Sequence, residues 1–171
     1  MYLAKRQGRV NMNKQDINLI VVEDDYAKFL SICLVLEFFD TLFFDANVVH
    51  LATFDEAEEY FEKELPSPDR TIVIMDLNMR RSPTQRMDVD TYELSRQLKK
   101  KYPDIVIIAN SSDKGNQYHQ KKLGNCDLAA GDDLLEAINQ ALDMIAQRQQ
   151  PAQNEYSECK DKHAMTECSP A

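Results

Sequence analysis

Glycine, proline and basic residues are scarce in this chain, and each shortage excludes a class of protein. Only four glycines and six prolines occur among 171 residues, which excludes collagen-like, low-complexity and wholly disordered chains. Lys and Arg number 20 against 29 Asp and Glu, so the formal net charge is −9. This sign is wrong for binding a nucleic acid backbone through the protein's general field. The composition therefore predicts a folded, acidic protein with no nucleic acid partner.

Long apolar runs and leader-like segments are also missing. The most apolar stretch, 29–44, is interrupted by polar residues such as Glu37 and Asp40 and falls short of the roughly 20 apolar residues of a membrane span. The first residues carry charge but lack the apolar core of a secretory signal. The four cysteines include no C-x-x-C pair, so reduced thiols are expected. We therefore expect a cytoplasmic protein with no membrane partner.

The chain is long enough for one ordinary domain with polar ends. Residues 1–16 are polar and basic without an apolar period, and we expect a flexible N-terminal arm there. Residues 148–171 are again polar, and we expect a disordered C-terminal tail. The folded domain is expected to span 17–147.

Short apolar runs alternate with helical patterns along 17–147. The expected strands are 17–22, 47–54, 71–76, 104–110 and 126–130. The expected helices are 26–44, a helix opened by Asp55 and stopped by Pro66, 88–101, 114–123, and a helix capped by Asp132 and Asp133 that ends near Gln147. A loop containing Pro83 is expected before the helix that begins near Asp88. Because the strands are too apolar to have a wet face, we predict an α/β fold with a doubly wound, five-stranded parallel sheet flanked by five helices.

Carboxylates follow two of the expected strands. Glu23 and Asp24 follow the first strand, Asp76 ends the third, and Ser111 follows the fourth. The carboxyl ends of parallel strands meet at one edge of a sheet, which is where ligands bind. Carboxylates held close together need a cation, and oxygen ligands suit Mg²⁺ or Mn²⁺. The sequence therefore predicts a site for a hard divalent ion at this edge.

At these residues the chain resembles the receiver domain (CheY-like, flavodoxin-like) of two-component response regulators. The matching motifs are VVEDD (21–25), IMDLNM (74–79), IIANSS (107–112) and LGNCD (123–127). They occur in the family's order and on the expected elements. The resemblance covers about residues 17–147, so it implies that this segment is a receiver-like domain.

The resemblance implies a role for each matching residue. Glu23 and Asp24 would hold Mg²⁺ together with Asp76 and the backbone carbonyl of Asn78. Asp76 would also be the phospho-accepting carboxylate, and Ser111 the hydroxyl that meets the phosphoryl group. The implied partners are a histidine kinase or phosphotransfer protein and a downstream protein target.

The chain departs from the family at several positions. Active receivers carry a lysine at the end of strand five, where this chain has Gly131, and no lysine occurs between Lys122 and Lys160. Leu128 replaces an aromatic residue that signals phosphorylation, and Val89 replaces a usual glycine. The resemblance therefore implies an atypical receiver.

Two functions from different classes are compatible with this pattern. The first is a stand-alone receiver that accepts phosphate on Asp76 and signals through protein contacts, because too few residues follow 147 for a DNA-binding domain. Such a protein is not an enzyme beyond self-phosphorylation from a phosphodonor. The alternative is a phosphorylation-independent, receiver-like adaptor. An aspartate-nucleophile phosphohydrolase ranks lower because Asn78 stands where that class has a second aspartate, and flavin binding ranks lowest because acids replace a hydroxyl-rich loop.

The first expected helix is apolar almost all round. Beyond the stripe needed to cover the sheet it carries Phe38, Phe39, Leu42, Phe43 and Phe44. A helix without a polar face is buried, either in its own core or against another chain. Extra core is the favoured interpretation, and a homodimer remains an alternative.

Overall fold

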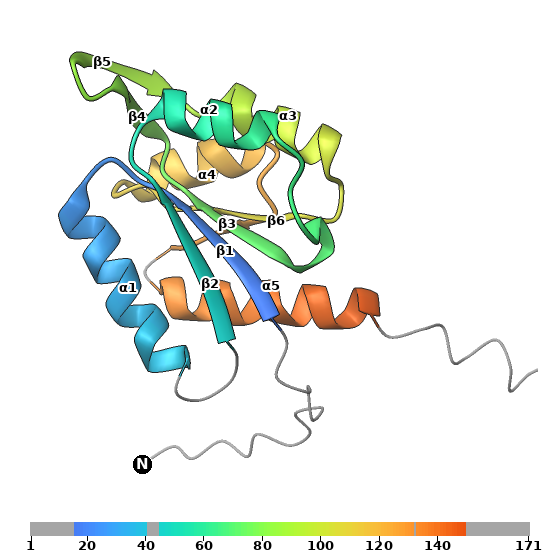
Figure 1. Ribbon diagram of the computed structural model, residues 1–171. Helices are drawn as coiled ribbons and strands as arrows, with labels where there is room; N and C mark the ends of the chain where they lie inside the picture. Colours follow the sequence, from blue (N-terminus) through green and yellow to red (C-terminus); the bar gives the residue numbers. More distant parts are fainter. Residues whose placement is uncertain (1–15, 41–44, 132, 150–171) are drawn as a thin grey trace, which may run out of the picture.

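The computed structural model describes residues 16–40, 45–131 and 133–149 (Figure 1). The strands are β1 (Asp16–Val22), β2 (Asp45–Leu51), β3 (Thr71–Met75), β4 (Asn78–Ser82), β5 (Gln85–Asp90), β6 (Val106–Ala109) and β7 (Leu128–Ala129). The helices are α1 (Tyr26–Asp40), α2 (Phe54–Glu62), α3 (Tyr92–Lys101), α4 (Lys114–Leu123) and α5 (Leu134–Gln149), with a short 3-10 helix η1 (Pro68–Arg70).

The main sheet has five strands in the order β2-β1-β3-β6-β7, and every neighbouring pair is parallel. The predicted five-stranded parallel sheet flanked by five helices is thereby confirmed. Alternate residues of β1 point to opposite faces: Leu19 and Val21 belong to one buried cluster, Ile20 and Val22 to the other. Both faces are covered, which is why the strand reads as a continuous apolar run.

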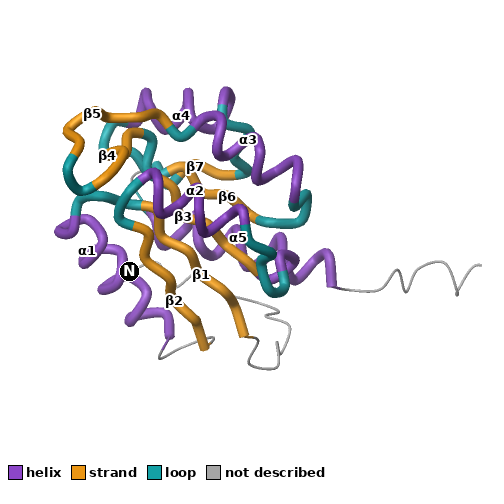
Figure 2. The backbone as a smooth tube through the Cα atoms, turned by 45° about the horizontal axis from the view of Figure 1, so that its top comes forward, coloured by secondary structure: helices purple, strands orange, loops and turns teal. Residues whose placement is uncertain are grey.

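The helices form one layer on each face of the sheet (Figures 1 and 2). Helices α1 and α5 cover one face, while α2, α3 and α4 lie over the other. Helix α5 contributes a stripe that includes Ile138 and Ile145, both at most 1% exposed. Leu94 and Leu98 of α3 pack on the opposite side. The two layers leave the carboxyl edge of β1, β3 and β6 between them, and this edge carries the site.

The segment after β3 differs from the prediction. In place of a loop and a helix from Asp88, β4 and β5 form an antiparallel hairpin, and α3 begins only at Tyr92. Met79 is fully buried and Val89 packs beside it, opposite it in the hairpin register. Charged and apolar residues alternate over 86–90, the pattern of a strand, and Pro83 lies at the hairpin turn.

Several expectations fall on residues outside the described ranges. Residues 1–15 and 150–171 contain most of the predicted arm and tail, and β1 and α5 extend to Asp16 and Gln149. Residues 43 and 44, on which the homodimer alternative partly rested, also lie outside them, and the side chains at 38 and 39 of α1 are not described. Among the described helices, none is both long and apolar enough to cross a membrane.

Candidate functional site

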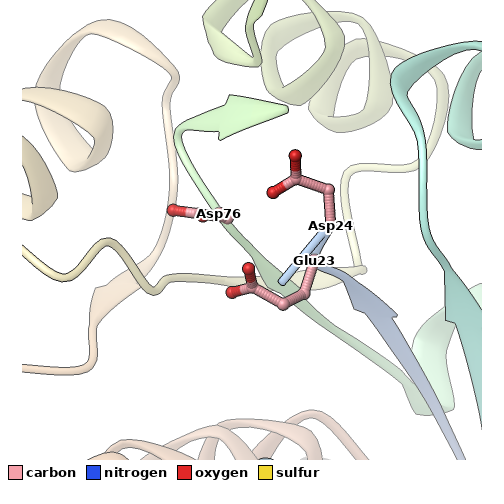
Figure 3. Close-up of side chains that lie close together, drawn as sticks. All are labelled: Glu23, Asp24 and Asp76. Atoms are coloured by element: carbon pink, nitrogen blue, oxygen red, sulfur yellow. The ribbon is translucent and has the colours of Figure 1, made fainter. Parts of the chain in front are cut away.

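The ends of β1 and β3 bring three carboxylates together. Val22 and Met75 are paired in register, and Asp76 N–H donates to the Val22 carbonyl at 2.9 Å. The residues that follow, Glu23, Asp24 and Asp76, therefore leave the sheet at the same level. Each offers a carboxylate oxygen within 4.8 Å of the others, and Figure 3 shows the three side chains at the strand ends.

A cavity of about 570 Å³ opens over these strand ends. Its lining includes Asp24, Asp76, Asn78 and Ser111, four of the residues singled out from the sequence. Ser111 is only 6% exposed and comes from the loop after β6. Glu23 completes the carboxylate cluster. The structure therefore brings together every predicted site residue, while the roles implied by the resemblance stay predictions.

Glu23 is a buried acid with an unsatisfied oxygen. The residue is 1% exposed; its Oε1 accepts a hydrogen bond from Asp25 N–H at 3.0 Å, and its Oε2 is buried without a hydrogen-bond partner among the described residues. Burial, followed by the charge of Asp76, raises the pKa of Glu23 to about 7. Either a proton or a bound cation would lower the free-energy cost of burying this oxygen.

Lys28 of α1 reaches into this cluster, which the sequence analysis missed. Its Nζ lies 3.0 Å from Asp76 Oδ2 and 3.5 Å from Glu23 Oε1. Burial lowers the pKa of Lys28, but its hydrogen bond and charge interaction with Asp76, aided by Glu23, outweigh burial and raise it. Lys28 is thus a protonated counter-ion for the Asp76 carboxylate.

Arg80 of β4 holds the third carboxylate. Its Nε and its backbone N–H both donate to Asp24 Oδ2 at 3.0 Å, and its Nη2 donates to the Asp24 carbonyl at 2.7 Å. These donors belong to β4, an extended strand that pairs with β5 directly after the end of β3. The sequence analysis missed this contact.

Gly131, which the resemblance aligns with the strand-five lysine, is tied to α4. Its φ is +62°, a left-handed conformation that favours glycine. Its N–H donates to Gln117 Oε1 at 2.6 Å, and Gln117 Nε2 donates to the Ser111 carbonyl. Gln117 therefore links the loop after β7 to the loop that carries Ser111.

The backbone around Asp76 is held from several directions. Thr91 Oγ1 donates to the Asp76 carbonyl at 2.7 Å, and Leu77 N–H donates to Asp76 Oδ1 at 2.7 Å. Gln120 Nε2 donates to the neighbouring Met75 carbonyl at 2.9 Å. These bonds fix Asp76 with one carboxylate oxygen toward its own loop and the other toward Lys28.

The donor set fits a hard divalent cation. Three carboxylates and the nearby Asn78 supply oxygen ligands of the kind that Mg²⁺ prefers. The unpartnered Oε2 of Glu23 is a ready ligand atom. Asp24 and Asp76 already contact Arg80 and Lys28, so an ion at this site would compete with two side-chain cations.

Comparisons with known structures agree with the fold. The receiver domain of a DNA-binding response regulator (merR) from Colwellia psychrerythraea 34H matches with a TM-score of 0.55 and 16% identity, over 75% of this chain and 99% of that one. The phosphorylated cyanobacterial phytochrome response regulator RcpA matches with a TM-score of 0.52 and 18% identity, over 77% and 89%. DrrB of Thermotoga maritima, an OmpR/PhoB homolog, matches with a TM-score of 0.53 and 16% identity over 80% of this chain, which spans 55% of DrrB.

These likenesses show that the chain has the receiver fold of response regulators. No family model and no curated protein matches the sequence. At such low identity the chemistry must be argued from the site.

Proposed function

We propose that this chain is an atypical receiver that binds Mg²⁺ and accepts a phosphoryl group on Asp76 from a histidine kinase or a phosphotransfer protein. The observation that carries the proposal is the cluster of Glu23, Asp24 and Asp76 at the carboxyl edge of a receiver-type sheet. The buried Oε2 of Glu23, which has no hydrogen-bond partner in the part of the chain that the structure describes, supports an ion at this place. Mn²⁺ would serve the same ligands.

The transfer step would be a substitution at phosphorus. A carboxylate oxygen of Asp76 attacks the phosphorus of a phosphohistidine, and an O–P bond forms as the N–P bond breaks. The bonding electron pair stays on the imidazole nitrogen, and the product is an acyl phosphate. Mg²⁺, held by the three carboxylates and the Asn78 carbonyl, would neutralise charge on the transferred group. Ser111 would donate its hydroxyl to a phosphoryl oxygen.

We further propose where the protein works and which partners it has. The protein would work in the cytoplasm, pass its signal to a downstream protein target, and catalyse nothing beyond its own phosphorylation. The net charge of −9 argues against a nucleic acid partner. Stand-alone action stays a prediction, and a homodimer stays an alternative.

A phosphorylation-independent adaptor is the second candidate, and one observation favours it. Lys28 and Arg80 already pair with Asp76 and Asp24. Charges that are balanced within the chain allow the fold to persist without an ion or a phosphoryl group. In this case Asp76→Asn would leave partner binding unchanged.

Intact-mass spectrometry separates the two candidates. The protein is incubated with Mg²⁺ and acetyl phosphate, with Asp76→Asn as the matched control. The receiver proposal expects the wild type to gain the mass of one phosphoryl group and the variant to gain none. No gain in the wild type, with acetyl phosphate and with a phosphorylated phosphotransfer protein, would contradict the receiver proposal and favour the adaptor.

A further inference from the structure

Lys28 occupies the cavity from the helix side. It lies in the first turn of α1, and helical side chains tilt toward the helix N-terminus, which here adjoins the end of β1. Its Nζ thereby lies 3.0 Å from Asp76 Oδ2, although Lys28 belongs to α1 and Asp76 follows β3. The side chain is 34% exposed, so its ammonium group has room to move with the atoms it contacts.

Few of the described side chains that line the cavity are positively charged. Among the described residues that line it, the positively charged ones are Lys28 and Arg80. Arg80 is engaged by Asp24 through its side chain and its backbone N–H. Gly131, at the end of the last strand, offers no side chain, and its N–H is taken by Gln117. Lys28 is therefore the cation in direct contact with the acceptor carboxylate.

A phosphoryl group on Asp76 would place new negative charge beside Lys28. The terminal oxygens of an acyl phosphate lie two bonds beyond the carboxylate oxygen that carries the phosphorus. An ammonium group 3.0 Å from Asp76 Oδ2 can follow this charge on a flexible four-carbon stem. Charge-assisted hydrogen bonds to phosphate oxygens are among the strong ones in proteins.

We propose that Lys28 is the cationic ligand of the phosphoryl group on Asp76 and its counter-ion before phosphorylation. This inference rests on the proposed function, since it needs a phosphoryl group at Asp76. It assigns to α1 the positive charge that the last strand of this sheet does not supply. In the resting state the same ammonium group competes with a divalent ion for Asp76 and Glu23.

If Lys28 is both a counter-ion and a phosphoryl ligand, loss of its charge should change the affinities for Mn²⁺ and for a phosphoryl analogue in opposite directions. Lys28→Met keeps a long stem but removes the charge, so the pocket should bind Mn²⁺ more tightly and a phosphoryl analogue more weakly. A purely structural residue would weaken both, because its loss would disorder the pocket.

Fluorine NMR with beryllofluoride and Mg²⁺ tests the phosphoryl part. Bound fluoride signals are expected in the wild type and in the control Lys63→Met, which removes an exposed ion pair with Glu59. Lys28→Met should bind the analogue about tenfold more weakly or worse, the loss of one charge-assisted hydrogen bond. Lys28→Arg, which keeps the charge, should retain more binding than Lys28→Met. Amide spectra of each variant establish that it is folded.

The outcomes distinguish this inference from the proposed function. Absence of bound fluoride in the wild type would overturn the proposed function and this inference with it. Equal binding by the wild type and Lys28→Met would overturn the inference alone. A Mn²⁺ titration without beryllofluoride completes the test: weaker Mn²⁺ binding by a folded Lys28→Met would also overturn the counter-ion role.

Discussion

Glu23→Gln turns a buried carboxylate into a neutral side chain of the same shape. Glu23 is 1% exposed, and burial together with Asp76 raises its pKa to about 7 from an ordinary value of 4.5. Between these two pH values the folded protein holds a proton on Glu23 that the unfolded chain has released. The free energy of unfolding must therefore fall as pH rises through this window and level off above it.

The size of the effect follows from the pKa shift. At 1.36 kcal/mol for each pKa unit, the shift corresponds to at most about 3 kcal/mol above neutral pH. The measured value should be smaller, because the pocket can relax and the new amide N–H needs an acceptor. Glu23→Gln lacks the titration, so it should be more stable than the wild type at about pH 8 and similar to it at about pH 5.

Urea denaturation at both pH values measures this difference. The chain contains no tryptophan, so unfolding is followed by far-ultraviolet circular dichroism. Addition of Mg²⁺ at the higher pH should stabilise the wild type more than Glu23→Gln, because the ion needs the ionised carboxylate. A stability difference between the two proteins that does not change with pH would refute the reasoning about the buried charge.

The layout of the sheet could be predicted from the sequence because both faces of its central strands are buried. Runs such as 17–22 and 71–76 then read as continuous apolar segments, and their alternation with helices fixes a parallel order. The carboxylate cluster follows from the same fact. Residues that come directly after neighbouring parallel strands share an edge, whatever rotamers they adopt, so Glu23 and Asp76 could be placed together.

The two cations could not be placed in this way. The contact of Lys28 with Asp76 depends on the phase of α1, since a residue one position away would point elsewhere. Its one available signal is its position four residues after Asp24, in the first turn of a helix that begins at the strand end. Arg80 contacts Asp24 from β4, a strand of the hairpin where a loop was expected. Proline at 83 suggested a loop, while the alternation of charged and apolar residues over 86–90 was the signal for a strand.

The remaining predictions concern the residues around the carboxylate cluster. Arg80→Ala should release Asp24 and tighten Mn²⁺ binding up to roughly fivefold, the range of an exposed ion pair; the control is Arg96→Ala, which breaks an exposed pair within α3. Weaker Mn²⁺ binding would instead mean that Arg80 positions Asp24 for the ion. Gly131→Lys, the change that would restore a lysine at the end of the last strand, should destabilise the fold. Apart from the residues adjoining Gly131, no atom of the described residues lies within 4 Å of a Cβ placed there, so the penalty arises from its φ of +62° and not from a clash. A left-handed conformation costs most residues about 1–2 kcal/mol, whereas Asn adopts it readily. Thermal unfolding should therefore rank the wild type, Gly131→Asn and Gly131→Lys in order of decreasing stability. Equal losses for the two variants would contradict this reasoning, because they would show that the penalty does not arise from the left-handed φ.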